Sequence, residues 1–277
     1  MSRTIAERRA RFRALHAEGC FLLPNPWDAG SARLMQHLGF EAIASTSSGH
    51  AWTRGLADYA VTRDQVLDHL AVLAAAVDIP VNADFETGFS ATPEGLAENV
   101  RLAVATGIAG LSIEDRDVAA IDSLYPAEMA VERIRAARAA IDGTGEDVLL
   151  VGRTEGLLTG GTVSDAIDRL VALADAGADC LYAPGIGMPG RGTIDDIAVM
   201  VRAVAPKPVN VLVVGSGIAM GALADAGVRR ISVGGALARI AWGAAVSAAE
   251  RLREGDLAAL DGALPGRDLD AIFGDAG

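Results

Sequence analysis

The sequence predicts an α/β fold, a (β/α)8 barrel of the TIM type, and three observations lead to it. Eight short apolar runs are separated by segments of helical periodicity, and several helices pass into the next run through a recurring glycine step. Continuous apolar runs are typical of parallel strands that are buried on both faces. Eight β–α units in about 215 residues match the size of one such barrel.

The predicted strands follow one another along the chain with helical segments between them. A doubly wound sheet would also alternate strands and helices, but it usually has fewer strands, and no G-x-G-x-x-G dinucleotide loop follows the first run. The barrel is therefore the preferred interpretation. Its strands are predicted at Cys20–Leu23, Ala42–Ser45, Pro80–Asp84, Gly110–Glu114, Val148–Arg153, Cys180–Ala183, Val209–Val213 and Arg230–Val233.

Signals for helix starts and ends lie between these runs. Thr92 can cap a helix that has Pro93 at its first position, and Thr162–Asp165 and Thr193–Asp196 have the spacing of a capping box. Glycine can adopt the left-handed conformation that ends a helix. It stands near the ends of four predicted helices, as Gly39, Gly107, Gly177 and Gly227.

The whole chain, residues 1–277, is predicted to be one barrel domain with a helical C-terminal extension from about residue 240 to residue 277. A chain of 277 residues can bury roughly three quarters of its unfolded surface. Its composition, 51% hydrophobic but only 4% aromatic, suits helices that pack closely on a sheet. The acidic tail beyond Arg253 is interpreted as a packing or oligomer-contact segment.

The net charge of −12 argues against nucleic acid or a membrane surface as a partner. A small anionic substrate would need an arginine, a metal or helix N-termini to hold it. Cys20 and Cys180 lie in apolar stretches without metal or disulfide spacing, so the cytoplasm is the expected compartment. The arginine-rich start lacks the apolar core of a secretory signal, and the longest apolar run, Leu70–Val77, is too short to span a membrane.

Acids follow several of the predicted strands. Asp84 and Glu86 lie at the end of the third run, and Glu114 ends the fourth. The active site of a barrel lies at the carboxyl ends of its strands, so these acids should converge, and a cation would offset their repulsion. Oxygen ligands without histidine or thiolate favour Mg²⁺ or Mn²⁺. Helix capping or surface ion pairs would explain any single acid better, but they explain three acids on adjacent strand ends less well.

Candidate substrate contacts follow the same strand ends. Arg153 ends the fifth run, and its planar guanidinium suits a carboxylate or phosphonate. A structural ion pair is an equally weighted alternative for it. Ser47, Ser48 and Gly49 offer hydroxyls and backbone N–H groups to a carboxylate, although such triplets also form ordinary turns. Asn210, near the start of the seventh run, is a further candidate for contacting the substrate.

Two aromatic side chains complete the candidate rim. His50 is the only one of four histidines in this region, so it is a candidate general acid or base. A lone histidine is more often structural, and the sequence does not decide between these roles. Trp27 can form the floor of the pocket or simply pack against neighbouring residues.

At these residues the sequence resembles the isocitrate lyase/phosphoenolpyruvate mutase superfamily, over roughly Phe21 to Ala245. Asn25–Ala32 resembles the opening segment of that superfamily, and Asn82–Phe89 resembles its metal loop. Ile113–Asp115 resembles the next strand end, and Gly152–Glu155 resembles an Ala-Arg-Thr-Asp motif. Each motif is weak alone, but together they are fairly specific.

The resemblance implies a barrel whose last helix can be exchanged with a neighbouring subunit, giving homo-oligomers that are dimers or tetramers. It implies Mg²⁺ near Asp84, with Glu86 and Glu114 in the water-mediated shell. It also implies that the Ser47–Gly49 segment and Arg153 hold the carboxylate and oxo group of the substrate. Asp58 matches a further acid near the reacting centre.

The sequence departs from the superfamily pattern in two places. The first acid of the metal loop is replaced by Asn82, and Glu86 is a candidate replacement for it. Isocitrate-type lyases carry a Lys-Cys-Gly-His loop soon after the fourth strand, whereas residues 116–125 contain no lysine, cysteine or histidine. Cleavage of isocitrate or methylisocitrate is therefore not expected, and Tyr125 or His50 would be the remaining sources of a proton.

The leading hypothesis is an Mg²⁺-dependent lyase that cleaves a C–C bond in a small 2-oxo or 2-hydroxy di-acid. Retro-aldol cleavage and decarboxylation both fit, because each passes through a pyruvate-like enolate. The first alternative is P–C bond chemistry of the phosphonomutase or phosphonopyruvate hydrolase type. The second is a barrel that has lost catalysis and binds a metabolite.

Overall fold

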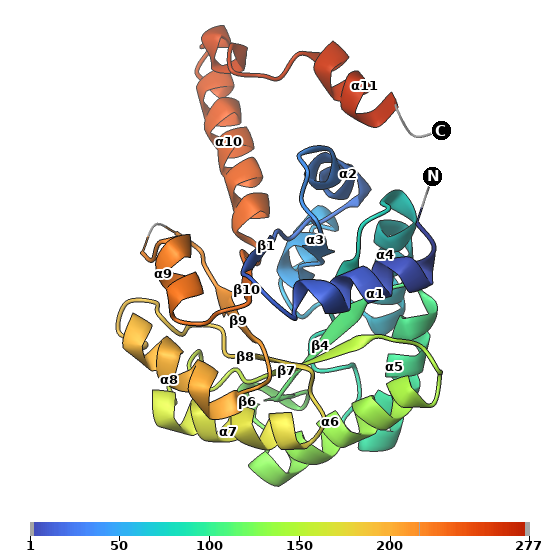
Figure 1. Cartoon of the computed structure of the whole chain (residues 1–277). Coiled ribbons are helices and arrows are strands. Elements are labelled where there is room, and N and C mark those ends of the chain that lie inside the picture. The colour runs from blue at the N-terminus through green and yellow to red at the C-terminus, as the bar shows by residue number, and fades with distance from the viewer. Residues whose placement is uncertain (1–2, 216, 275–277) are drawn as a thin grey trace.

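The computed structural model describes residues 3–215 and 217–274 and contains one eight-stranded parallel sheet that closes into a barrel (Figure 1). The strands run in the order β1-β10-β9-β8-β7-β4-β3-β2. At the remaining gap the Ala44 N–H donates to the Pro24 carbonyl at 3.0 Å. All eight predicted strands are confirmed, with bounds β1 Phe21–Leu23, β2 Ile43–Ala44, β3 Val81–Asp84, β4 Gly110–Glu114, β7 Leu149–Arg153, β8 Cys180–Tyr182, β9 Val209–Leu212 and β10 Arg230–Ser232.

Helices surround the barrel. The predicted caps at Thr92, Thr162 and Thr193 are present, and the last two form complete capping boxes. The four glycines predicted to end helices have φ values between 86° and 109°. The helices up to the last strand are α1 Ile5–Leu15, α2 Ala29–His37, α3 Ser47–Thr53, α4 Arg63–Ala76, α5 Pro93–Ala105, α6 Ala127–Asp142, α7 Val163–Asp175, α8 Ile194–Val204 and α9 Met220–Asp225.

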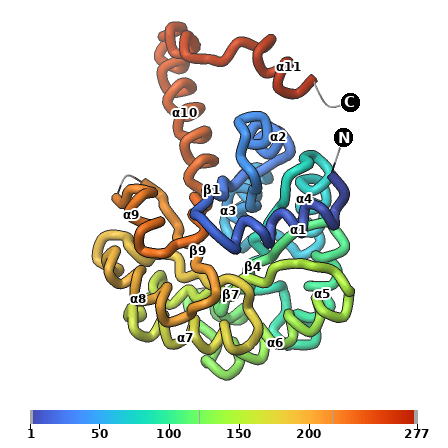
Figure 2. Tube along the Cα trace, in the orientation of Figure 1, coloured from blue at the N-terminus to red at the C-terminus, as the bar shows by residue number. Residues whose placement is uncertain are grey.

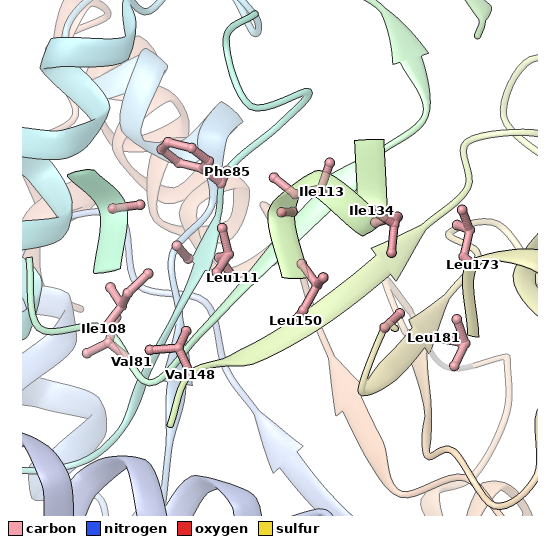
Figure 3. Close-up of a cluster of buried hydrophobic side chains, with 14 of the residues drawn as sticks. Val81, Phe85, Ile108, Leu111, Ile113, Ile134, Val148, Leu150, Leu173 and Leu181 are labelled. Carbon is pink, nitrogen blue, oxygen red and sulfur yellow. The ribbon is translucent and has the colours of Figure 1, made fainter. Parts of the chain in front are cut away.

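The main apolar core lies between the strands and the surrounding helices (Figure 3). Outward-facing strand residues such as Leu111 and Leu150 meet Ile134 of α6, and all three are at most 2% exposed. Each such side chain contributes about 1.5–3 kcal/mol through its burial. This layer holds the strands in register, so it fixes where their carboxyl ends place polar side chains.

The interior of the barrel is apolar only at its amino end. There Phe12 of α1 is fully buried against Phe21 and other apolar residues. Beyond this apolar layer the interior is polar and includes Asn82, Asn210 and Arg230, which come from the first or second residues of their strands and are each at most 4% exposed. The barrel therefore has one closed end and one polar end.

A short antiparallel hairpin, which is not among the eight predicted strands, follows β4. Its strands are β5 Arg116–Asp117 and β6 Ala120–Leu124. This hairpin occupies the segment in which isocitrate-type lyases carry their Lys-Cys-Gly-His loop. It is held to the barrel by an ion pair between Arg116 and Glu155, with a nitrogen–oxygen distance of 3.2 Å.

The C-terminal helix α10, Ala236–Arg253, extends away from the barrel (Figures 1 and 2). It begins four residues before the predicted start of the extension. The chain continues through η1, Leu257–Leu260, and α11, Gly266–Gly274. α11 packs on α2, where Arg33 donates to the Phe273 carbonyl at 2.9 Å. No helix within residues 3–215 and 217–274 is long and apolar enough to cross a membrane.

Candidate active site

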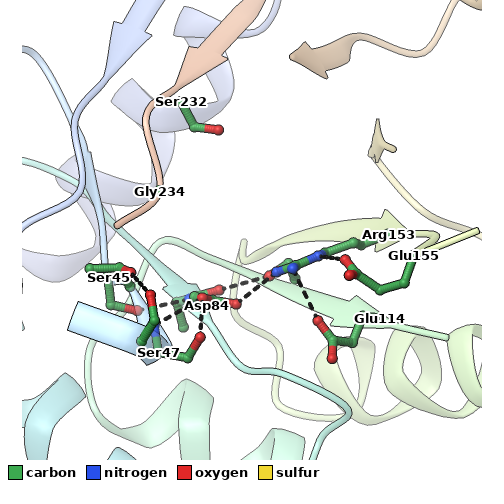
Figure 4. Close-up of polar contacts among 12 residues, drawn as sticks. Ser45, Ser47, Asp84, Glu114, Arg153, Glu155, Ser232 and Gly234 are labelled. Carbon is green, nitrogen blue, oxygen red and sulfur yellow. Dashed lines mark hydrogen bonds and ion pairs between the residues drawn. The ribbon is translucent and has the colours of Figure 1, made fainter. Parts of the chain in front are cut away.

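A cavity of about 170 Å³ opens at the carboxyl ends of the strands. Most of its lining is polar, and it reaches from the rim down into the polar part of the barrel interior. Six of the predicted site residues line it: Ser47, Ser48, Asp58, Asp84, Arg153 and Asn210. The structure therefore brings these predicted residues together from β3, β7, β9, the start of α3 and the loop after it. Figure 4 shows Ser47, Asp84 and Arg153.

Asp84 is held by several donors at the end of β3. Its Oδ2 accepts hydrogen bonds from the Ser47 backbone N–H at 3.0 Å and from the Ser47 hydroxyl at 2.9 Å. Its Oδ1 accepts from Arg153 Nη1 at 3.1 Å. The Asp84 N–H donates to the Ser45 hydroxyl at 2.8 Å, so both the backbone and the carboxylate have fixed positions.

Arg153 lies among three carboxylates. Its Nη1 contacts Asp84 and its Nε contacts Glu155. Its Nη2 lies 3.3 Å from Glu114 Oε2. The structural ion pairs considered as one alternative for Arg153 are therefore present. The side chain is 15% exposed and lines the cavity, so the same guanidinium is both positioned by acids and accessible to an anion.

Glu86 occupies an unusual position just beyond β3. Its φ is 48°, in the left-handed region that a non-glycine residue adopts at a cost of about 1–3 kcal/mol. The side chain is 5% exposed, and its Oε1 is buried without a hydrogen-bond partner. Burial, followed by the negative charges of Asp84 and Glu114, raises the pKa of Glu86 to about 9. A carboxyl group in this position lacks a positive partner.

Two neighbouring acids also have raised pKa values, chiefly because of burial. Burial raises the pKa of Glu114, although Arg153 opposes that shift. Desolvation and the charge of Asp84 raise the pKa of Asp58 at the mouth of the cavity. A divalent cation would relieve both effects, and the donors are all oxygens, so the residues fit Mg²⁺ or Mn²⁺.

These acids do not form a cage that could bind an ion through protein atoms alone. Across the described residues, no group of three or more His, Cys, Asp and Glu side chains is arranged to hold a metal. Mg²⁺ usually keeps several of its waters and takes one or two carboxylates directly. The arrangement is consistent with Asp84 as the direct ligand and Glu86 and Glu114 acting through water.

The segment Ser47–Gly49 forms the first turn of α3, capped by Thr46. Ser47 and Ser48 line the cavity, but Gly49 does not. The Gly49 N–H donates to the Thr46 hydroxyl at 3.3 Å. A side chain at Gly49 would collide with Thr46 Cγ2 at 2.6 Å. The prediction of Gly49 as a substrate contact is therefore corrected to a packing role.

His50 and Trp27 also lie away from this cavity: α3 turns His50 toward α4, and Trp27 lies in the loop before α2. The His50 ring stacks on His69, with ring centroids 3.8 Å apart. Both side chains line a separate cavity of about 290 Å³ together with Trp27. The structure thus does not place His50 where it could exchange a proton with a ligand at Arg153, nor Trp27 on the floor of that pocket.

Several lining residues were not predicted. Tyr59 donates to Glu114 Oε1 at 2.9 Å, and Tyr182 lies under Arg153, whose Cζ is 5.3 Å from the ring centroid. Arg230 reaches the cavity from the start of β10. Tyr125, considered as a proton source, instead accepts a hydrogen bond from Val118 N–H and stacks on Arg133.

Fold and site together define a class of protein: an α/β barrel with an acidic, arginine-containing cavity at the carboxyl ends of its strands. A sequence profile described as phosphoenolpyruvate phosphomutase matches residues 12–253. The chain belongs to this family, and so to the isocitrate lyase/phosphoenolpyruvate mutase superfamily of lyases and mutases. Membership of this family of enzymes supports catalysis over the alternative of a metabolite-binding barrel.

Individual relatives agree with this placement. An uncharacterized protein of Mycobacterium tuberculosis is 31% identical over 249 residues, which cover 88% of this chain and 90% of the relative. An oxaloacetate decarboxylase of Bradyrhizobium is 33% identical over 205 residues, or 70% of this chain and 68% of the relative. A solved structure from Burkholderia cenocepacia, described only as a lyase or mutase, is 45% identical with a TM-score of 0.93 and covers 98% of each chain.

Proposed function

We propose that this enzyme is a divalent-metal-dependent lyase that cleaves a C–C bond in a small 2-oxo or 2-hydroxy di-acid. The observation that carries the proposal is that Asp84 and Arg153 line one cavity at the strand ends and form an ion pair there, while Glu114 pairs with Arg153 just outside the lining. The size of that cavity, about 170 Å³, is close to that of an engineered cavity of about 150 Å³ that accepts benzene. The Bradyrhizobium relative supports a small di-acid as substrate.

Asp84 is the residue that we expect to bind the metal directly, with Glu86 and Glu114 as outer partners. When bound, the cation supplies Lewis-acid polarisation of the 2-oxo group. The protein fixes the ligand for this task, because Ser47 and Arg153 orient the two oxygens of Asp84. Asn82 replaces the acid found in related metal loops, and its side chain points instead to the barrel interior, near Arg230.

The chain's own groups then hold the substrate and its developing charge. Arg153 is preorganised by three acids, so it needs no rearrangement when negative charge grows on the oxo group. Ser48 lies at the same rim and offers a hydroxyl to the carboxylate. Retro-aldol cleavage and decarboxylation both leave an electron pair on carbon, which these cationic and hydrogen-bonding groups stabilise until a proton arrives.

Tyr59 is the strongest candidate for moving that proton. Tyr59 lines the cavity, and its hydroxyl donates a hydrogen bond to Glu114. Neither cysteine lines the cavity, and burial raises the pKa of the Cys180 thiol. The hairpin β5–β6 carries no thiol in the segment where isocitrate-type lyases have a cysteine. We therefore expect the phenol of Tyr59 to take the place of that cysteine as the proton donor.

The test uses the purified enzyme with Mg²⁺ and a panel of 2-oxo and 2-hydroxy di-acids, with oxaloacetate first and pyruvate release as the readout. Asp84→Asn should lower kcat/KM by about 100-fold or more, comparable with the loss of one transition-state charge contact. Asp195→Asn, at an exposed position on α8, is the matched control and should retain activity. Full activity and unchanged Mg²⁺ affinity in Asp84→Asn would refute the proposal.

P–C bond chemistry is the second candidate, and the family description favours it. The same oxygen and arginine platform would hold phosphonopyruvate, because a phosphonate suits the guanidinium of Arg153 as well as a carboxylate does. Following pyruvate and phosphate separately distinguishes the two reactions. Phosphate release from phosphonopyruvate without turnover of any di-acid would select this candidate.

The oligomeric form is proposed to be a dimer or tetramer in which α10 packs on a second copy of the chain. Three of the exposed apolar side chains of α10 are Ile240, Trp242 and Val246, which are 67%, 48% and 54% exposed. Leu22 in the middle of β1 is 40% exposed although its strand neighbours are buried. The exposed apolar side chains of α10 and the exposed outer face of β1 could therefore cover each other between two copies of the chain. This complementarity supports exchange of α10 between copies.

A further inference from the structure

We infer that Arg230, on the floor of the cavity, binds the second carboxylate of a dicarboxylate substrate and so makes the enzyme select di-acids over mono-acids. The inference rests on the proposed function for the reaction at the rim, but it concerns a different residue and a different end of the substrate. Arg230 opens β10, is 2% exposed, and lines the cavity together with Asn82 and Asn210.

All hydrogen bonds recorded for the Arg230 guanidinium have neutral partners. Nε donates to Asn210 Oδ1 at 3.0 Å, and Nη1 donates to Asn82 Oδ1 at 3.4 Å. Nη1 also lies 3.4 Å from His16 Nε2. His16 Nδ1 lies 2.7 Å from the Phe12 carbonyl, which assigns the ring proton to Nδ1 and leaves Nε2 as an acceptor. Burial and the charge of Arg230 lower the pKa of His16 to about 3, so the ring is neutral.

The positive charge of Arg230 is therefore not balanced locally. Among residues 3–215 and 217–274, no carboxylate forms an ion pair with it. A buried charge without a counterion costs several kcal/mol. Arg153, by contrast, already has three acids around it. The two arginines of the cavity thus differ: Arg153 is paired with carboxylates, whereas Arg230 has only neutral partners.

The guanidinium of Arg230 also retains donors for a ligand. Arg230 Nη2 makes no hydrogen bond to the described part of the chain, and this atom is not fully buried. It therefore retains access to the cavity, which Arg230 lines. Asn210 is held in place by its own donation to the Ser232 hydroxyl at 3.0 Å. The floor thus presents a fixed, planar cation with free N–H groups, which suits a carboxylate.

The consequence is a substrate that spans the cavity. One carboxylate and the 2-oxo or 2-hydroxy group lie at the rim with Arg153 and Ser48, and the second carboxylate lies at the floor with Arg230. A substrate with a methyl group at that end would leave the charge of Arg230 without a partner. Sites that bury an unpaired polar group in this way discriminate strongly against the analogue that lacks the matching group.

The experiment compares L-malate with L-lactate, which share a 2-hydroxy carboxylate and differ in the second carboxylate. Dissociation constants are measured by calorimetry on the full-length protein at fixed Mg²⁺, independently of turnover. Arg230→Met should weaken malate binding by roughly 10- to 100-fold, the factor expected for a charge-assisted hydrogen bond, and leave lactate binding nearly unchanged. Arg229→Met, the neighbouring arginine that bonds the Gly19 carbonyl outside the cavity, should leave both unchanged.

Retention of the full preference for malate in Arg230→Met would overturn the inference, and so would equal binding of the two acids by the unaltered protein. If Arg230→Met does not fold, Arg230→Lys keeps the charge and should keep part of the preference. A crystal of the unaltered protein with malate then decides directly: a carboxylate within hydrogen-bond distance of Arg230 supports the inference, and its absence there refutes it. Failure of the lyase proposal would appear as absent turnover, with the malate preference intact.

Discussion

Glu86→Gln is predicted to remove a specific pH dependence from the stability of the metal-free protein. The pKa of Glu86 is raised to about 9 by burial and by neighbouring acids, from an ordinary value of 4.5. Between these values the folded protein keeps a proton that the unfolded chain has released. Raising the pH through this window therefore opposes folding, and the stability associated with the protonated group is lost as the pH approaches 9.

The magnitude follows from the linkage relation. Each pH unit inside the window corresponds to about 1.4 kcal/mol for one proton, so Glu86 should lower the free energy of unfolding by at most about 2.7 kcal/mol between pH 6 and pH 8. Gln keeps the shape of the side chain without the titration. The variant should therefore lose less stability than the unaltered protein over this range.

The assay is urea denaturation in EDTA at pH 6, 7 and 8, with the difference between the two proteins as the readout. Glu114 and Asp58 are present in both proteins, so the difference reports Glu86 together with its electrostatic coupling to these acids. Glu132→Gln, on the exposed surface of α6, should reproduce the unaltered protein. Parallel slopes for Glu86→Gln and the unaltered protein would show that Glu86 is not a protonated, buried acid.

Three further predictions concern other parts of the molecule. Tyr59→Phe should lower kcat by about 100-fold if the Tyr59 hydroxyl moves the proton. The free energy of unfolding should fall by only about 1 kcal/mol. An unchanged kcat would exclude this role for Tyr59. Thr154→Val removes the donor to Asp115, 2.7 Å away in a fully buried site, and should cost about 1–3 kcal/mol in chemical denaturation. Trp242→Glu should lower the molar mass measured by light scattering. Val199→Glu, at an exposed position on α8, should leave the molar mass unchanged. The same molar mass for Trp242→Glu and the unaltered protein would contradict packing through α10.

The strands were predictable because the evidence for them is local. A run such as Leu149–Arg153 is buried on both faces, and continuous apolar residues reveal that without knowledge of its neighbours. The convergence of Asp84, Glu114 and Arg153 followed from a single rule, that parallel strands end at one rim. The capped starts of α5, α7 and α8 were likewise local signals.

The remaining features depend on tertiary contacts that a linear pattern does not contain. The orientation of the short helix α3 determines that Ser47 faces the cavity while His50 faces α4. That orientation is set by packing against the rest of the fold. Arg230 was predicted only as the first residue of the eighth strand, and its place in the cavity lining depends on closure of the barrel. The hairpin β5–β6 is too short and too polar to produce a periodic signal.

Because α1 closes the amino end of the barrel with Phe12 against Phe21, the cavity has a single mouth at the opposite end. In the proposed lyase reaction, substrate and both products would therefore use the same opening. With the substrate bound as proposed, the fragment nearer the mouth would depart before the fragment beside Arg230. The barrel would thereby impose an order of product release, in which the inner fragment leaves last and competes with the next substrate.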